Sequence, residues 1–144
     1  MKAVFLAFLF TWLAATAQDS KTAHTFTGCY ELKPAGWLSS VRLYHDEYLP
    51  RRFQLTMRHI NNGLEVKNLD SNVRQDLRLS AWNVKDERKV EIVWSTGFVG
   101  WSIQLSGSDA DFRGTAQFFT DTDTQPSSPI TIVTHAVNCK GLAN

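Results

Sequence analysis

The sequence holds few side chains whose type and spacing could support catalysis or metal binding. Its four histidines are His24, His45, His59 and His135. None of them pairs with another at a metal-ligand spacing such as H-x-H, and none is adjacent to a cysteine. A zinc site would therefore have to be assembled from distant segments. The sequence also lacks a G-x-S-x-G elbow, a P-loop and a dinucleotide-binding fingerprint. We therefore expect a noncatalytic protein without a cofactor.

Two pairs of aspartates accompany predicted turns. Asp109 and Asp111 flank one turn, and Asp121 and Asp123 alternate with threonines before a loop that contains two prolines. Oxygen-rich loops can hold calcium, but these residues do not form an EF-hand pattern. Aspartate is also an ordinary turn residue, because its side chain bonds to nearby backbone groups. We therefore predict no metal site.

The first residues resemble a signal peptide. Lys2 is followed by an apolar run over residues 3–13, and Ala15-Thr16-Ala17 provides small residues at a cleavage site. The apolar run is shorter than the roughly 20 residues that a membrane span requires, so a signal peptide is preferred to an anchor. We predict cleavage after Ala17, a secreted or extracytoplasmic protein, and one domain over residues 18–144.

Cys29 and Cys139 are the only two cysteines. In an exported chain this number favours a disulfide, with a metal site or two free thiols as the alternatives. Cys29 lies in the first strand-like segment and Cys139 ends the last one. The predicted bridge would join the two ends of the domain and leave no thiol nucleophile.

The charges are balanced, with 15 Lys and Arg against 14 Asp and Glu. Such a chain has no long-range field for nucleic acid or an anionic membrane, and neither partner is expected. Arg58 and His59 form a small basic cluster with Arg51 and Arg52. We interpret this cluster as part of a mixed surface rather than as a phosphate site.

Apolar and polar residues alternate through most of the chain, which is typical of strands with one buried face. Asn61-Asn62-Gly63 is a strong hairpin-turn signal between two of these segments. One short helix is compatible with residues 37–48, before Pro50. The predicted strands cover residues 26–32, 52–59, 64–69, 76–84, 90–95, 101–106, 111–120 and 130–138.

About eight short strands with hairpin-length links predict an all-β domain, either an up-and-down antiparallel β-barrel or a sandwich. A bridge between the first and last strands favours the barrel. An eight-stranded barrel has room for packed side chains or for one small ligand, and both interiors remain open here.

Two groups of residues are candidates for binding. A set of inward-facing positions would line a site for a small apolar or aromatic ligand. It consists of Phe53, Met57, Trp94, Trp101 and Phe118. The second group is Trp82, on the polar face of its predicted strand, and Phe98, on a turn. These two could engage a protein or a polysaccharide, although a second hydrophobic cluster would also explain Trp82.

Several motifs are similar to those of a family of small exported bacterial proteins with no known activity. They are Gly28-Cys29-Tyr30, Leu49-Pro50, the stretch Trp94-Ser95-Thr96-Gly97-Phe98-Val99-Gly100, the Gly114 strand with Phe118 and Asp121, and the closing Cys139. The Gly-x-aromatic opening also resembles calycin barrels such as lipocalins, with Tyr30 where lipocalins usually carry Trp. This resemblance implies a calycin-like barrel but names no ligand.

Overall fold

The fold is seen in a computed structural model that describes residues 22–35, 46–108, 111–122 and 127–141. The predicted signal peptide over residues 1–17 lies outside the described residues. Most of the helix predicted over residues 37–48 also lies outside them. Its last residues form the short 3-10 helix η2, Asp46–Tyr48.

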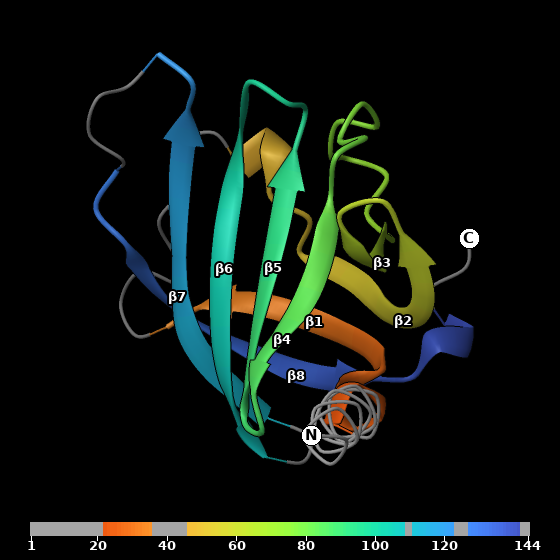
Figure 1. The fold of residues 1–144 in the computed structure, drawn as a ribbon. Helices are drawn as coiled ribbons and strands as arrows, with labels where there is room; N and C mark the ends of the chain where they lie inside the picture. The colour runs from red at the N-terminus through yellow and green to blue at the C-terminus, as the bar shows by residue number, and fades with distance from the viewer. Residues whose placement is uncertain (1–21, 36–45, 109–110, 123–126, 142–144) are drawn as a thin grey trace, which may run out of the picture.

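The protein is an all-β, closed antiparallel barrel of eight strands, as the alternating segments predicted. Each strand is hydrogen-bonded to its neighbours in the sequence, which gives the up-and-down order that Figure 1 shows. A second 3-10 helix, η3 (Cys139–Gly141), follows the last strand. The strands are β1 (Gly28–Pro34), β2 (Arg52–Ile60), β3 (Gly63–Asn68), β4 (Ala81–Asp86), β5 (Lys89–Ser95), β6 (Val99–Ser108), β7 (Asp111–Thr120) and β8 (Ile130–Val137).

The barrel closes where β1 pairs with β8 as well as with β2. The predicted disulfide lies at this seam and is confirmed, with the Cα atoms of Cys29 and Cys139 5.3 Å apart. Cys29 is buried in β1, and Cys139 follows β8 at the start of η3. The bridge therefore joins the first strand to the end of the last, where the two strands already pair.

Several strands match the sequence prediction closely. The prediction of a strand over residues 111–120 is confirmed at both ends by β7. The predicted turn at Asn61-Asn62-Gly63 joins β2 to β3, with Ile60 opposite Gly63. These strands are predictable because apolar residues alternate regularly and a strong turn signal ends each run.

The predicted strand over residues 76–84 is wrong in its first half, because β4 begins only at Ala81. Residues 77–80 form turns instead. The Ser80 hydroxyl donates to the Leu77 carbonyl at 2.8 Å and accepts from the Ser95 amide at 3.1 Å. Leu79, an apolar residue within this predicted strand, is 50% exposed. The first strand also starts later than predicted, at Gly28, because residues 22–26 form a helical turn.

Aromatic side chains meet short helical segments at the two ends of the barrel. At one end Phe26 of the helical turn contacts Phe112, and the Tyr30 hydroxyl donates to the Phe26 carbonyl at 2.8 Å. Burial raises the pKa of the Tyr30 phenol. At the other end Tyr48 of η2 contacts Phe118, with ring centroids 6.2 Å apart. Figure 1 shows the helical turn at the lower end and η2 at the upper end, behind the β5–β6 hairpin.

Within the described ranges, no helix has the length and apolar character needed to cross a membrane.

The disulfide should contribute strongly to stability, because it closes a loop with a sequence separation of 110 residues. The double variant Cys29→Ala/Cys139→Ala should lower the free energy of unfolding by about 4–5 kcal/mol, on the chain-entropy account of cross-links. Urea denaturation followed by circular dichroism would measure this loss. Wild-type protein in reductant is the control and should unfold at nearly the same urea concentration as the variant. A loss below about 1 kcal/mol would contradict the prediction.

Candidate functional site

The structure brings four of the five predicted ligand-site residues together inside the barrel. Trp94 of β5 lies opposite Trp101 of β6, and Trp101 lies opposite Phe118 of β7. The ring centroids of Trp101 and Phe118 are 5.5 Å apart in an edge-on arrangement, and those of Phe53 and Trp94 are 6.0 Å apart. These distances are typical of contacting aromatic pairs, so the four rings form a buried aromatic cluster.

Met57, the fifth predicted residue, does not take the fully buried position expected from simple alternation. The pairing of β2 with β3 shifts register between Leu55 and His59, which is the sign of a β-bulge. The bulge breaks the period-two pattern, so Met57 is only partly buried. The prediction failed here because a bulge leaves no clear signal in the sequence.

Three buried polar atoms have no hydrogen-bond partner within the described part of the chain. They are the Trp94 indole nitrogen Nε1, the Thr134 hydroxyl and the Asn68 side-chain nitrogen Nδ2. Asn68 lies opposite Phe53 in the β2–β3 pairing, so both side chains are on the inner face. Because buried polar groups are almost always hydrogen-bonded, these atoms distinguish the interior from an ordinary apolar core.

Trp82, a candidate for surface binding with burial in a hydrophobic cluster as the alternative, is fully buried with 0% exposure. It belongs to the hydrophobic core and lies opposite Leu64 of β3. Its indole N–H donates to the carbonyls of Thr56 at 3.0 Å and Glu65 at 3.1 Å. Burial excludes Trp82 as a surface-binding residue.

Phe98, the other predicted surface residue, is 68% exposed. The turn beneath it is held by hydrogen bonds from the Thr96 amide to the Val99 carbonyl and from the Gly97 amide to the Ser95 hydroxyl. Gly97 has a φ of 108°, which disfavours other residues. The turn motif therefore fixes the backbone and leaves the Phe98 ring in solvent.

Gly100 ends this motif for a different reason. A Cβ atom at this position would lie 1.9 Å from the Trp94 carbonyl oxygen, far inside contact distance. Only glycine allows β5 and β6 to approach so closely next to the turn.

A hollow of about 410 Å³ lies beside Phe98 at this end of the barrel. Its lining includes Tyr48, Arg74 and Arg78, which the sequence analysis did not single out. Arg74 donates to both carboxylate oxygens of Asp76, at 2.9 and 2.6 Å, and its guanidinium carbon lies 5.1 Å from the centre of the Tyr48 ring. The hydrogen bond from Arg74 lowers the pKa of the Asp76 carboxyl. No sequence pattern connects Tyr48 with this segment, because folding alone brings them together.

The other polar candidates do not converge on a site. His135 is exposed, with Nδ1 2.8 Å from the carboxylate of Asp111. Asp109 and Asp123 lie outside the described residues, and so does His45. Among the residues that the structure does describe, no group of three or more potential ligands could hold a metal ion.

Comparison of the chain with known protein families, with curated proteins and with solved structures gives no match. The resemblance to small exported proteins therefore stays a prediction from the motifs, whereas the eight-stranded antiparallel barrel expected from the strand pattern is confirmed by the structure.

Two buried tryptophans provide a matched test of the unpaired indole. Trp82→Phe removes two hydrogen bonds, whereas Trp94→Phe removes none from the described structure. Trp82→Phe should therefore lower the free energy of unfolding by about 1–3 kcal/mol more than Trp94→Phe. Urea denaturation of the ligand-free protein, followed by circular dichroism, would compare them. Equal losses would mean that the Trp94 N–H is hydrogen-bonded in solution.

Proposed function

We propose that this protein is an extracytoplasmic, noncatalytic binding protein. Its ligand would be small, largely apolar or aromatic, and would carry one hydrogen-bond acceptor. The disulfide supports an oxidising compartment, because such bridges persist mainly outside the cytoplasm. The closed barrel supports a binding role, because barrels of this size can hold one small ligand.

The Trp94 indole nitrogen carries this proposal. It is a hydrogen-bond donor inside an aromatic cluster, in a side chain that is 1% exposed, and no described protein group accepts its proton. A buried donor without an acceptor destabilises a protein by about 1–3 kcal/mol. A buried water is a poor partner in such surroundings, since it usually makes about three hydrogen bonds to polar groups. An acceptor on an otherwise apolar ligand satisfies the donor without that requirement.

The ligand's hydrogen-bond acceptor would be a carboxylate or a carbonyl oxygen. Trp94 Nε1 and Asn68 Nδ2 are both hydrogen-bond donors. The Trp94 ring contacts the Phe53 ring, and Asn68 is paired with Phe53 across β2 and β3. The aromatic rings contact one another, so a ligand must displace at least one of them. Tyr48 is only partly buried and covers Phe118, which makes this end of the barrel the proposed entrance.

Aromatic and aliphatic carboxylates would test the interior site. Phenylpropionate, indoleacetate and octanoate are suitable probes, with calorimetry and thermal unfolding as measurements. A true ligand at 100 times its Kd should raise the free energy of unfolding by about 2.7 kcal/mol. Trp94→Phe should weaken its binding about tenfold, by loss of a charge-assisted hydrogen bond.

Trp82→Phe is the matched control and should bind as wild type does, because the Trp82 N–H is already satisfied by protein carbonyls. The proposal fails if none of the probes binds at millimolar concentration, or if Trp94→Phe binds as tightly as wild type.

A second candidate function is recognition of a protein or a polysaccharide at the barrel surface. The observation that favours it is Phe98, which a hydrogen-bonded turn holds 68% exposed beside a hollow. Exposed aromatics on a rigid scaffold are common binding groups, because little side-chain freedom is lost on contact. Trp82 takes no part in this function, since it is buried.

If the Phe98 side chain serves binding and not folding, the fold should remain stable when this residue is replaced. Phe98→Ser should change the free energy of unfolding by less than about 0.5 kcal/mol, as for other exposed positions. Phe118→Ser should lower it by at least about 3 kcal/mol, because that ring is buried against Trp101. Chemical denaturation of both variants would test this. A large loss for Phe98→Ser would assign the ring a structural role instead.

A further inference from the structure

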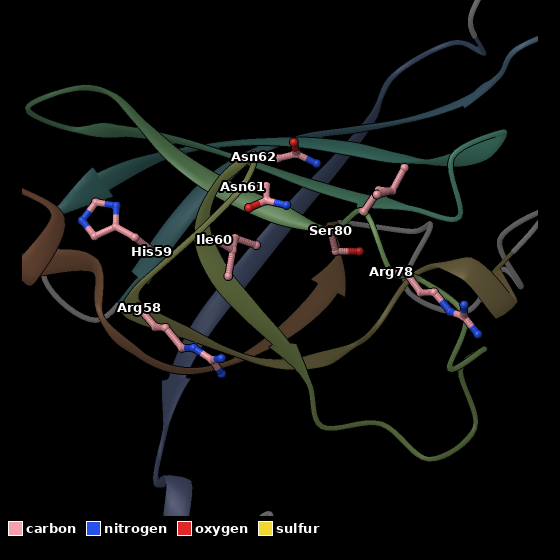
Figure 2. Close-up of a pocket in the computed structure, with 8 residues that line it drawn as sticks. Arg58, His59, Ile60, Asn61, Asn62, Arg78 and Ser80 are labelled. Atoms are coloured by element: carbon pink, nitrogen blue, oxygen red, sulfur yellow. The ribbon is translucent and has the colours of Figure 1, made fainter.

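A second hollow, of about 480 Å³, lies between the β2–β3 hairpin and the segment that precedes β4. Its volume is within the range of about 300–1,000 Å³ that is usual for ligand sites. Figure 2 shows Arg58 and Arg78 on opposite sides of this hollow, with Ile60 and Ser80 between them. Its lining residues are Arg58, His59, Ile60, Asn61, Asn62, Arg78, Leu79 and Ser80.

The lining of this hollow contains two arginines and a histidine but no carboxylate. Arg58 is ion-paired to Glu65 at 3.1 Å, but its side chain is 73% exposed. Such pairs contribute little to stability, so Arg58 can exchange this partner for a ligand. Glu65 would keep its contacts with the Thr56 hydroxyl at 3.0 Å and with Lys67 at 3.8 Å.

Arg78 lines the hollow on the side opposite Arg58 and is exposed, with its guanidinium directed away from Arg58 in Figure 2. Within the described residues its guanidinium forms no ion pair. Together the two hollows are lined by three arginines, Arg58, Arg74 and Arg78, and by one carboxylate, that of Asp76, so positive charge exceeds negative charge in their lining. This arrangement is complementary to an anion, although the chain as a whole is nearly neutral.

This hollow adjoins the hollow beside Phe98. Arg78 also lines the hollow beside Phe98, so the two spaces share one wall. Leu79 packs over the turn. Its Cδ1 atom lies 3.2 Å from the position that a Cβ atom would take at Gly97. The surface from Arg58 to Phe98, joined at Arg78, therefore presents arginines, the Asp76 carboxylate, the amides of Asn61 and Asn62, and an exposed ring, and this surface is called the tract below.

We propose that this tract binds an acidic polysaccharide, a sugar chain that carries carboxylate or sulfate groups. The arginines would pair with these groups, the asparagine amides would bond to hydroxyls, and the Phe98 ring would stack on a sugar face. The inference rests on the second candidate function and names its partner class. An acidic peptide fits less well, because the closed barrel offers no free strand edge to which a peptide could add.

Fluorescence anisotropy with labelled oligosaccharides would test the proposal on the full mature chain. The probes are oligogalacturonate, which is carboxylated, heparin oligosaccharides, which are sulfated, and maltooligosaccharides, which are neutral. We expect at least one acidic probe to bind at least tenfold more tightly than the neutral one. Its affinity should fall when NaCl is raised from about 50 mM to about 200 mM, as for other polyanion contacts.

The double variant Arg58→Gln/Arg78→Gln should weaken that binding at least tenfold. Arg113→Gln, which removes one exposed charge from β7 outside the tract, is the control and should bind as wild type does. Circular dichroism of each variant would confirm that it is folded.

Other outcomes overturn the inference in distinguishable ways. If neither acidic probe binds at millimolar concentration, or if the arginine variant binds as wild type does, the acidic sugar site is wrong. If polyglutamate binds more tightly than both acidic sugars, the partner is an acidic peptide instead. If the neutral sugar binds equally well and only Phe98→Ser reduces binding, surface recognition stands but its proposed charge does not.

Discussion

The indole N–H of Trp82 holds the barrel together where its sheet is weakest. β3 and β4 share a single register pair, Leu64 with Trp82, whereas the other strand pairs share four or more. Thr56 lies between Leu55 and His59, where the register of β2 against β3 shifts and no regular partner is paired with it. One buried side chain of β4 donates to a carbonyl of β2 and a carbonyl of β3. The indole N–H thereby satisfies two backbone carbonyls in a region with few strand-to-strand hydrogen bonds, since buried backbone groups need hydrogen-bond partners.

How much of this could be read from the sequence depends on how local each signal is. β7 and the Asn61-Asn62-Gly63 turn are encoded by neighbouring residues, and both are predicted well. The disulfide follows from the number and position of the cysteines. The start of β4 is set instead by two hydrogen bonds with Ser95, fifteen or more positions along the chain. The Ser95 amide donates to the Ser80 hydroxyl, and the Leu79 amide donates to the Ser95 carbonyl. Ala81 and Trp82 are both buried, so the alternation that placed Trp82 on the polar face does not hold at the beginning of β4.

The candidate sites show the same limit. The aromatic cluster was predictable because its members share the inward parity of their strands. The surface tract was only partly predictable, because Phe98 and Arg58 were visible as unusual residues but Arg78 was not. It lies in an irregular segment, and only the fold places it across a hollow from Arg58. Tyr48 joins this end of the barrel in the same way, through a ring contact with Phe118.

The placement of the disulfide has a mechanical consequence. It fastens the β1–β8 seam covalently, while the joint between β3 and β4, several strands around the barrel, relies on one register pair and one indole. Local openings of a folded protein occur where the fewest interactions must break. The barrel therefore has one covalently fixed seam, between β1 and β8, and one weakly paired joint, between β3 and β4. Transient local opening of the barrel should begin between β4 and β3, the strand that carries Asn68.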